Sequence, residues 1–291
     1  MKKWAAILGV LGFAAVAGCG SPERLTESQE YYVGRGVAAS AVVATDGLVQ
    51  GELEAYVNLV GLTVSMESDR PDTHKGYFFG VLKSDAVNAF AAPGGFIFVT
   101  TGALKKMENE DELAGVLAHE VAHVNLRHPE ESANKATQKS GVMGILSKGE
   151  HLGTAGAIAG GALTYFGQAK AGDAVKTAGE NLAKVVKAFG GVLDGMLEEL
   201  MVNGYGRESE LQADAFAVDL LTRPGVRYDP SALGAFVGRL PKSDRGAWST
   251  HPELEGRVKN IQDEVKKRGV KSAVDPERTK RFLAMKVALG L

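Results

Sequence analysis

The sequence has almost no cysteine: Cys19 is the only one in 291 residues. A single thiol cannot close a disulfide within the chain, so stabilisation by internal disulfides is excluded. A surplus of charge is also missing, because 33 Lys and Arg stand against 35 Asp and Glu, a formal net charge of −2. Nucleic-acid binding requires a basic surplus or a basic stripe, and the sequence has neither. Hydrophobic residues make up 45% of the chain, enough for a substantial core in one large domain or two small ones.

The N-terminus has the composition of a cleaved export signal. A short positive segment, residues 1–3, precedes an apolar run of fourteen residues, 4–17, which is too short to span a bilayer comfortably. The run ends in Val16-Ala17-Gly18-Cys19. One interpretation is an ordinary secretory signal with an incidental cysteine. We favour the other, that the segment resembles a bacterial lipobox: residues 1–18 are then the leader, and Cys19 becomes the lipidated first residue of a membrane-tethered chain.

The residue after Cys19 bears on location. It is Gly20 rather than Asp, and resemblance to lipoprotein sorting in bacteria with two membranes then favours the outer membrane. We therefore expect a lipoprotein of the bacterial cell envelope that faces the periplasm. Residues 19–50 are predicted to form a tether and an N-terminal helix, and residues 51–291 the main domain.

Apolar spacing predicts an α+β domain that is mostly helical. Two helices are expected within 30–64, followed by strands at 77–82, 87–91 and 96–101. Pro93-Gly94-Gly95 is a strong turn signal before the last strand, so the sheet is predicted to be small, antiparallel and meandering. Further helices are expected at 109–126, 204–221 and 252–267.

Residues 130–205 are rich in Gly, Ala and Lys. Within them, residues 152–169 carry no charge, but five of the eighteen are Gly. So much Gly weakens a spanning helix, although the spacing of Gly156 and Gly160 leaves a membrane-dipping hairpin as an alternative. We favour a helical insert that packs over or beside the active site, as a possible lid.

The chemistry of the sequence is concentrated at Leu113-Ala-Gly-Val-Leu-Ala-His119-Glu120-Val-Ala-His123. Residues four apart on a helix leave the same face, so His119 and His123 can both reach one Zn²⁺. Glu120 lies on the flank, where its carboxylate can take a proton from a water that attacks a carbonyl. The alternative, a surface helix with two satisfied histidines, fits poorly with the apolar residues around the motif. The pattern therefore predicts a zinc site on a buried helix.

A catalytic zinc needs a third protein ligand. Glu210 and Asp214 are four apart on one predicted helical face, whereas Glu208 points about 200° away from Glu210. The segment continues into apolar residues, which argues against a solvated acidic face. Glu210 is therefore the predicted third ligand. Asp214 is predicted to accept a hydrogen bond from a ligand histidine and so fix its tautomer.

Two side chains near these motifs are assigned to structure. His128 lies about 140° around a helix from His123, off the ligand face. Tyr205 is expected to pack, with contact to an oxyanion as the alternative.

Together these residues resemble the HtpX and CAAX prenyl endopeptidase family of zinc peptidases (peptidase family M-48). Three further stretches agree with that family. Asn88-Ala-Phe-Ala-Ala-Pro93-Gly94-Gly95 is similar to its Asn-Ala-Phe-Ala-x-Pro-Gly-Gly segment. Residues 119–128 read H-E-V-A-H-V-N-L-R-H, close to H-E-x-x-H-V-x-x-R-H. Thr250-His251-Pro252, with Arg257 after it, resembles its Ser/Thr-His-Pro…Arg. The resemblance covers roughly residues 50–130 and 204–268.

The resemblance implies a zincin (gluzincin) core that binds one Zn²⁺ per chain through His119, His123 and Glu210, with Glu120 as the catalytic base. It places His251 near the zinc, as a transition-state stabiliser or an inhibitory fourth ligand, unless this histidine is only a loop residue before a helix. Arg257 is expected beside the ligands. The resemblance also implies that an edge strand binds an extended peptide by main-chain pairing, through Gly95, Phe96, Ile97, Phe98 and Val99.

Integral members of the family carry several membrane spans, and none is found in this sequence. The resemblance is therefore to the soluble periplasmic branch, which includes lipoproteins and works in outer-membrane quality control. We expect an endopeptidase that cuts unfolded or misassembled envelope proteins, with no nucleic-acid partner and its oligomeric state left open. The alternatives are a latent or non-proteolytic chaperone or assembly factor on the same fold, and a membrane-active structural lipoprotein that uses the insert.

Overall fold

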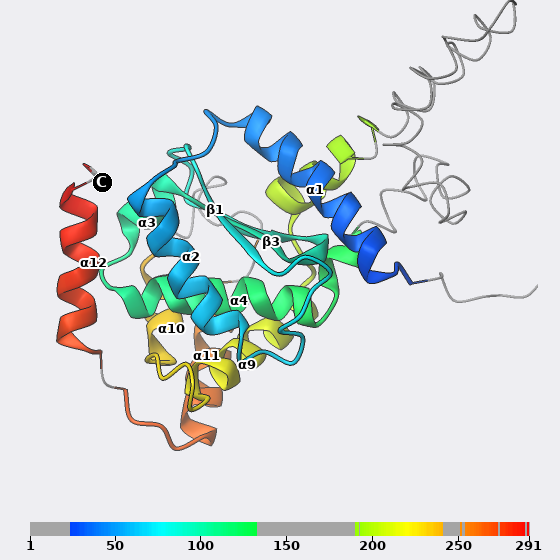
Figure 1. Cartoon of the computed structure of the whole chain (residues 1–291). Coiled ribbons are helices and arrows are strands. Elements are labelled where there is room, and N and C mark those ends of the chain that lie inside the picture. The colour runs from blue at the N-terminus through cyan, green and yellow to red at the C-terminus, as the bar shows by residue number, and fades with distance from the viewer. Residues whose placement is uncertain are drawn as a thin grey trace, which may run out of the picture.

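The computed structural model describes residues 24–132, 190–191, 193–240, 251, 254–272, 274–288 and 290. Over this part of the chain the prediction of a mostly helical α+β fold is confirmed (Figure 1). None of the helices described is long and apolar enough to cross a membrane. The predicted leader, Cys19 and residues 133–189 of the predicted insert lie outside the described residues and stay predictions.

The elements follow one another along the chain with the helices in the majority. They are α1 (Glu27–Ala44), α2 (Glu52–Ser65), β1 (Phe78–Leu82), β2 (Ala89–Ala92), η1 (Pro93–Gly95), β3 (Phe96–Thr100), α3 (Thr101–Lys106), α4 (Glu110–Asn125), η2 (Glu199–Asn203), α9 (Arg207–Thr222), α10 (Ser231–Arg239), α11 (Leu254–Lys267) and α12 (Pro276–Ala288).

The sheet is mixed, and the prediction of an antiparallel meander is wrong in this respect. Its strand order is β1-β3-β2. β2 and β3 form an antiparallel hairpin with Ala91 opposite Ile97, whereas β1 runs parallel to β3 with Phe79 opposite Ile97. The chain reverses after β2 and inserts β3 between the two earlier strands, so β3 runs the same way as β1. β3 is therefore the central strand of this sheet, and β2 lies at an edge.

The hairpin turn of η1 also seats the N-terminal helix. Gly94 and Gly95 have φ angles of 74° and 89°, a backbone region that favours glycine. Gly34 of α1 lies so close to the turn that an added Cβ would come within 1.7 Å of the Pro93 carbonyl oxygen. α1 therefore lies directly on the turn between β2 and β3.

The side chains of the strands alternate between two faces and so enter two cores. One face packs with α2 and α4 in the larger core and carries Phe79, Val81, Ala89, Ala91, Ile97 and Val99. The other face packs with α1 and with residues 193–205 and carries Leu82, Phe90, Ala92 and Phe98. In Figure 1, accordingly, α1 lies on one side of the sheet and α4 on the other.

Helix α4 lies at the centre of the fold, and nearly all of its side chains are buried. The Asn109 side chain caps it by accepting a hydrogen bond from Glu112 N at 2.9 Å, and the acidic first turn complements the helix dipole. α2, α9 and α10 pack around it. The helix ends after Asn125 because Arg127 has a φ of 61°, which turns the chain away from the helix axis.

The first turn of α4 anchors the C-terminal helix α12, which the sequence analysis did not predict. Glu110 accepts hydrogen bonds from Tyr56 of α2 at 2.5 Å and from Arg281 of α12 at 2.7 Å. Asp111 pairs with Arg278 of α12 at 2.9 Å. These buried carboxylates hold α12 against α4, the helix that carries the histidine motif.

Candidate metal centre and active site

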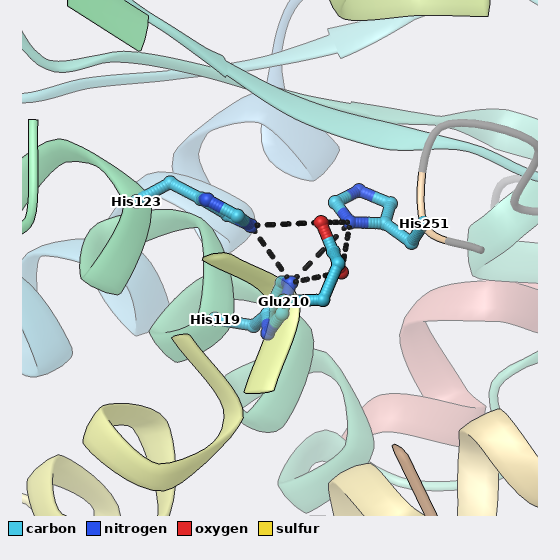
Figure 2. A group of neighbouring side chains, drawn as sticks. All are labelled: His119, His123, Glu210 and His251. Carbon is cyan, nitrogen blue, oxygen red and sulfur yellow. Dashed lines mark hydrogen bonds and ion pairs between the residues drawn. The ribbon is translucent and has the colours of Figure 1, made fainter. Parts of the chain in front are cut away.

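The two histidines of the motif on α4 meet a carboxylate from α9. The Nε2 atoms of His119 and His123 are 3.0 Å apart. Glu210 places Oε2 at 3.3 Å from His119 Nε2 and Oε1 at 3.5 Å from His123 Nε2. His251 joins them, with Nδ1 at 2.9 Å from Glu210 Oε2 and 3.3 Å from His119 Nε2. The four side chains are buried, point toward one another, and offer donor atoms that all lie within 4.8 Å (Figure 2).

Helix α9 presents Glu210 and Asp214 to α4 because both lie on its buried face. Glu210, Ala213, Asp214 and Ala217 recur at helical spacing, and all four are buried. The small alanine side chains let the two helices approach closely. Both predicted acids therefore reach the histidines of α4, although they lie some ninety residues away in sequence.

The outer side of the ligand group is a buried ion-pair network. Asp214 Oδ1 lies 3.0 Å from His119 Nδ1, the ring nitrogen that faces away from the ligand cluster. Arg257 of α11 holds Asp214 with two hydrogen bonds, at 2.6 and 2.9 Å, and its Nη1 lies 3.2 Å from Glu210 Oε2. Asp214 and Arg257 thus lie beside the candidate ligand residues, Asp214 as its helical spacing predicts and Arg257 as the family resemblance implies.

His128 contacts the second histidine, which the sequence analysis did not expect. Its Nδ1 lies 2.8 Å from His123 Nδ1. The helical angle that predicted His128 to lie off the ligand face does not apply. The positive φ of Arg127 reverses the chain before residue 128, so this residue is not on the helix. The Arg-His pair directly after the end of the helix was the signal available in the sequence.

Glu120 is buried beside this cluster without the hydrogen bonds that a buried carboxylate needs. Both of its carboxylate oxygens lack a hydrogen-bond partner within the described part of the chain, and its nearest charged contact is His251 Nε2 at 3.3 Å. An ionised group buried in this way is costly unless a cation or a donor compensates it. Two imidazoles and a carboxylate are the donor set of catalytic zinc sites. The residues therefore fit a metal ion such as zinc, with Glu120 beside it.

The sequence pattern that defines Peptidase family M48 matches residues 52–265. The chain belongs to this family. The resemblance stated from the motifs is thereby confirmed, and with it the assignment to a family of metallopeptidases. α1 and α12 lie outside the matched residues.

Curated relatives carry protease names. The putative beta-barrel assembly-enhancing protease of Vibrio cholerae is 26% identical over 217 residues, 72% of this chain and 39% of the relative. The beta-barrel assembly-enhancing protease of Escherichia coli K12 is 26% identical over 242 residues, 80% of this chain and 42% of the relative. A protease HtpX homolog of Desulfatibacillum aliphaticivorans is 30% identical over 223 residues, 69% of this chain and 67% of the relative. The chain spans about two fifths of the length of the first two relatives.

Without a metal, the electrostatics of the M48 site favour the metal-binding protonation states of Glu210 and His123. Burial and the charge of Arg257 lower the pKa of His119, but its hydrogen bonds to Asp214 and Glu210 outweigh them and raise this pKa. Burial alone would raise the pKa of Glu210, but the charges of His251 and Arg257 outweigh burial and hold this pKa well below its usual value. Burial, together with the neighbouring His119, holds the pKa of His123 well below its usual value. An ionised carboxylate and a neutral imidazole are the forms that coordinate zinc.

His251 is the cationic partner of the M48 carboxylates in this structure. Burial opposes its protonation, but the charges of Glu210 and Glu120 outweigh burial and raise the pKa of His251 to about 10. Its ring lies between these two carboxylates and offsets their mutual repulsion.

The strand that was predicted to bind substrate does not lie at the edge of the sheet. Residues 96–99 belong to β3, which pairs with β1 on one side and with β2 on the other, and Gly95 ends the turn before it. A strand paired on both sides has no main-chain edge for a peptide. The strand at the sheet edge beside α4 is β2, which the sequence analysis treated as an ordinary strand. The order of strands depends on pairing between distant segments, which local patterns do not reveal.

Tyr205 reaches both the ligand residues and this edge strand. Its ring stacks on His123 with centroids 4.0 Å apart and an interplanar angle of 21°. Its hydroxyl donates a hydrogen bond to Ala91 O at 3.1 Å, and burial, with the nearby charges of Glu120 and Glu210, holds the pKa of Tyr205 well above its usual value. The expectation that Tyr205 packs is correct for its ring. It did not include the hydrogen bond that the hydroxyl makes to Ala91 O. Only its place between two glycines, just before the helix of Glu210, marked it in the sequence.

Proposed function

We propose that this M48 protein is a zinc endopeptidase in which His119, His123 and Glu210 hold one zinc ion and Glu120 is the general base. The single observation that carries the proposal is the buried Glu120 carboxylate, which lies beside three converging ligands and has no hydrogen-bond partner among the described residues. Bound zinc would supply a Lewis acid that polarises a peptide carbonyl and makes water more acidic.

The residues of the chain supply the proton chemistry and the positioning. The Glu120 carboxylate would take the proton of the attacking water and pass it to the leaving amine. Asp214 would accept the Nδ1 proton of His119, which keeps Nε2 of that ring turned toward the ligand group. Arg257 would keep Asp214 in place from the other side.

His251 is proposed to be an inhibitory fourth ligand in this closed arrangement. Its Nε2 donates a hydrogen bond to Ala89 O at 3.1 Å, and its Nδ1 is directed to the ligand group. Without a metal both ring nitrogens of His251 carry a proton, and a bound metal would displace the proton from Nδ1 while Nε2 keeps the proton that it donates to Ala89 O. The alternative role predicted from the resemblance, stabilisation of the transition state, would require this ring to withdraw when substrate enters.

The substrate would be an extended polypeptide, with the edge of β2 rather than β3 as its main-chain partner. Since two relatives are named beta-barrel assembly-enhancing proteases, we propose unfolded or misassembled envelope proteins as substrates. A lipid anchor at Cys19 and attachment to the outer membrane are part of the same proposal.

The closed site also favours a second candidate, a latent protein that assists assembly and rarely cleaves.

The test uses residues 20–291 and the unfolded substrate casein. Wild type and Glu120→Gln should each bind about one zinc per chain, and cleavage should fall at least about a hundredfold in the variant because the base is lost. Glu208→Gln, an exposed change on α9, is the control and should cleave like wild type. Cleavage only after His251→Ala would support the latent candidate. A chain that binds no zinc would contradict the proposal.

A further inference from the structure

The edge of β2 has two outward-facing carbonyls next to the proposed catalytic centre. Thr100 N donates to Asn88 O at 3.0 Å, so even-numbered residues of this strand turn their main-chain groups toward β3. In an antiparallel pair the intervening residues turn theirs the other way. The carbonyls of Ala89 and Ala91 therefore face away from the sheet, at the two-residue spacing that an added strand would use.

Both carbonyls are held by side chains of the protein itself. His251 Nε2 binds Ala89 O at 3.1 Å, and the Tyr205 hydroxyl binds Ala91 O at 3.1 Å. Both side chains are nearly inaccessible, with 1% of His251 and 7% of Tyr205 exposed. The two donors come from segments far apart in the sequence. Each makes the hydrogen bond to a β2 carbonyl that an N–H group of an added strand would otherwise make.

We propose that His251 and Tyr205 occupy the two main-chain positions of the substrate, and that Tyr205 sets how readily a peptide enters. The inference rests on the proposed function. A peptide that pairs with β2 must replace the Tyr205 hydroxyl at Ala91 and the His251 ring at Ala89 with its own N–H groups. The ring that leaves Ala89 is the same ring that is directed at the ligand group, so pairing with the edge opens the catalytic centre.

The same geometry fixes which part of the peptide is cut. His251 Nε2 lies 3.1 Å from Ala89 O and 3.3 Å from Glu120 Oε1, so the position at Ala89 adjoins the general base. The residue that pairs with Ala89 is therefore next to the scissile bond, and the residue that pairs with Ala91 is an anchor two residues away. Substrates need an N–H at the anchor, and a proline or N-methyl residue there is rejected because it has no donor.

The test measures binding of fluorescein-labelled casein in the Glu120→Gln background, where no cleavage interferes. Tyr205→Phe keeps the ring on His123 and removes only the hydroxyl, which leaves Ala91 O without its donor in the closed protein. The dissociation constant should fall about three- to tenfold, the effect of one net hydrogen bond. The control is Tyr228→Phe, which removes another buried hydroxyl, one bound to Glu110 at 3.1 Å away from the edge, and should leave the constant unchanged.

Unchanged or weaker casein binding in Tyr205→Phe would overturn the inference, provided that urea unfolding shows both variants to be folded. With Glu120 intact, KM should fall by the same factor and kcat should stay. A fall in kcat with KM unchanged would instead place Tyr205 in the chemistry and also overturn the inference. Tighter binding without any zinc-dependent cleavage would support the role of Tyr205 and contradict the proposed endopeptidase, so the two failures are distinct.

Discussion

His119 and His123 each turn one ring nitrogen toward the ligand group and the other toward a buried partner. For His119 the partner is Asp214 at 3.0 Å, and for His123 it is His128 at 2.8 Å. Such contacts orient a ligand ring and fix its tautomer before a metal binds. Asp214 in turn depends on Arg257, whose side chain is 1% exposed, so the ring orientation is set by residues from α4, α9 and α11 together.

We expect Asp214→Asn to weaken zinc binding by about ten- to a hundredfold, since His119 loses the carboxylate that accepts its Nδ1 proton. Titration with zinc buffered by a competing chelator measures this affinity. Asp219→Asn on the same helix is the matched control, because Asp219 is 44% exposed and pairs with Arg223 rather than with the ligand residues. Equal zinc affinity in the two variants would show that Asp214 does not support His119.

The grouping of the side chains proposed as metal ligands could be predicted from the sequence because helical spacing decides which side chains share a face. His119 and His123 lie on one helix, and Glu210 and Asp214 on another, and each pair needed only this local rule. The rule gave the wrong position for His128 because Arg127, with its positive φ, ends the helix geometry. Tyr205 belongs to no repeating pattern, and only the packing of residues 193–205 against β2 brings it to His123.

Among the secondary-structure elements, the order of the strands decides where a peptide can pair. The three strands themselves were predicted within about two residues. Runs of aromatic and β-branched residues mark β1 and β3, and the Pro93-Gly94-Gly95 turn signal marks the end of β2. The central place of β3 follows from its parallel pairing with β1, a strand that β2 and the turn η1 separate from it in the sequence. The difference matters for function, since it moves the expected substrate edge from Phe96–Val99 to Ala89 and Ala91.

The position of helix α1 on the hairpin turn is predicted to depend on the close contact between Gly34 and Pro93. We expect Gly34→Ala to destabilise the protein by about 3 kcal/mol, because the new methyl group would meet the Pro93 carbonyl, which cannot move without the turn. Gly36→Ala is the matched control: its methyl would meet only the flexible end of Leu193 and gains helix propensity, so stability should stay within about 1 kcal/mol. Urea unfolding measures both, and equal effects would contradict the close contact.

A second contact between α1 and the end of α4 is predicted to depend on pH. Glu130 lies against Glu30 of α1, with Arg127 bound to both carboxyls. Burial and the hydrogen bond and charge of Glu30 raise the pKa of Glu130 from 4.5 to about 8. Because the folded-state pKa is the higher one, this contribution to stability is fully present below pH 4.5 and is lost as the pH rises through about 8.

The free energy of unfolding of wild type, relative to Glu130→Gln, should therefore fall by about 1–2 kcal/mol between pH 6 and pH 9. Urea unfolding at a series of pH values measures this difference, and Glu131→Gln, an exposed neighbour, should show none. A difference between wild type and Glu130→Gln that does not change with pH would show that burial and Glu30 do not raise the pKa of Glu130.

For the molecule as a whole, the described residues form a closed peptidase core braced by helices outside the family match. α1 covers the hairpin turn and α12 is bound to the first turn of α4. The ligand residues, Glu120 and the outward carbonyls of β2 are all inaccessible in this arrangement. If the proposed function holds, a substrate would have to displace part of the protein before cleavage, as expected of a peptidase that is kept inactive until an unfolded chain is present.

Zinc K-edge X-ray absorption of the zinc-loaded protein, wild type beside His251→Ala, tests the closed zinc site most directly because it counts the imidazoles on the metal. We expect about one zinc per chain in both proteins, with three imidazole ligands in wild type and two in the variant, and faster casein cleavage by the variant. An imidazole count that His251→Ala leaves unchanged would contradict the role given to His251. A zinc ion without imidazole ligands would contradict the site itself.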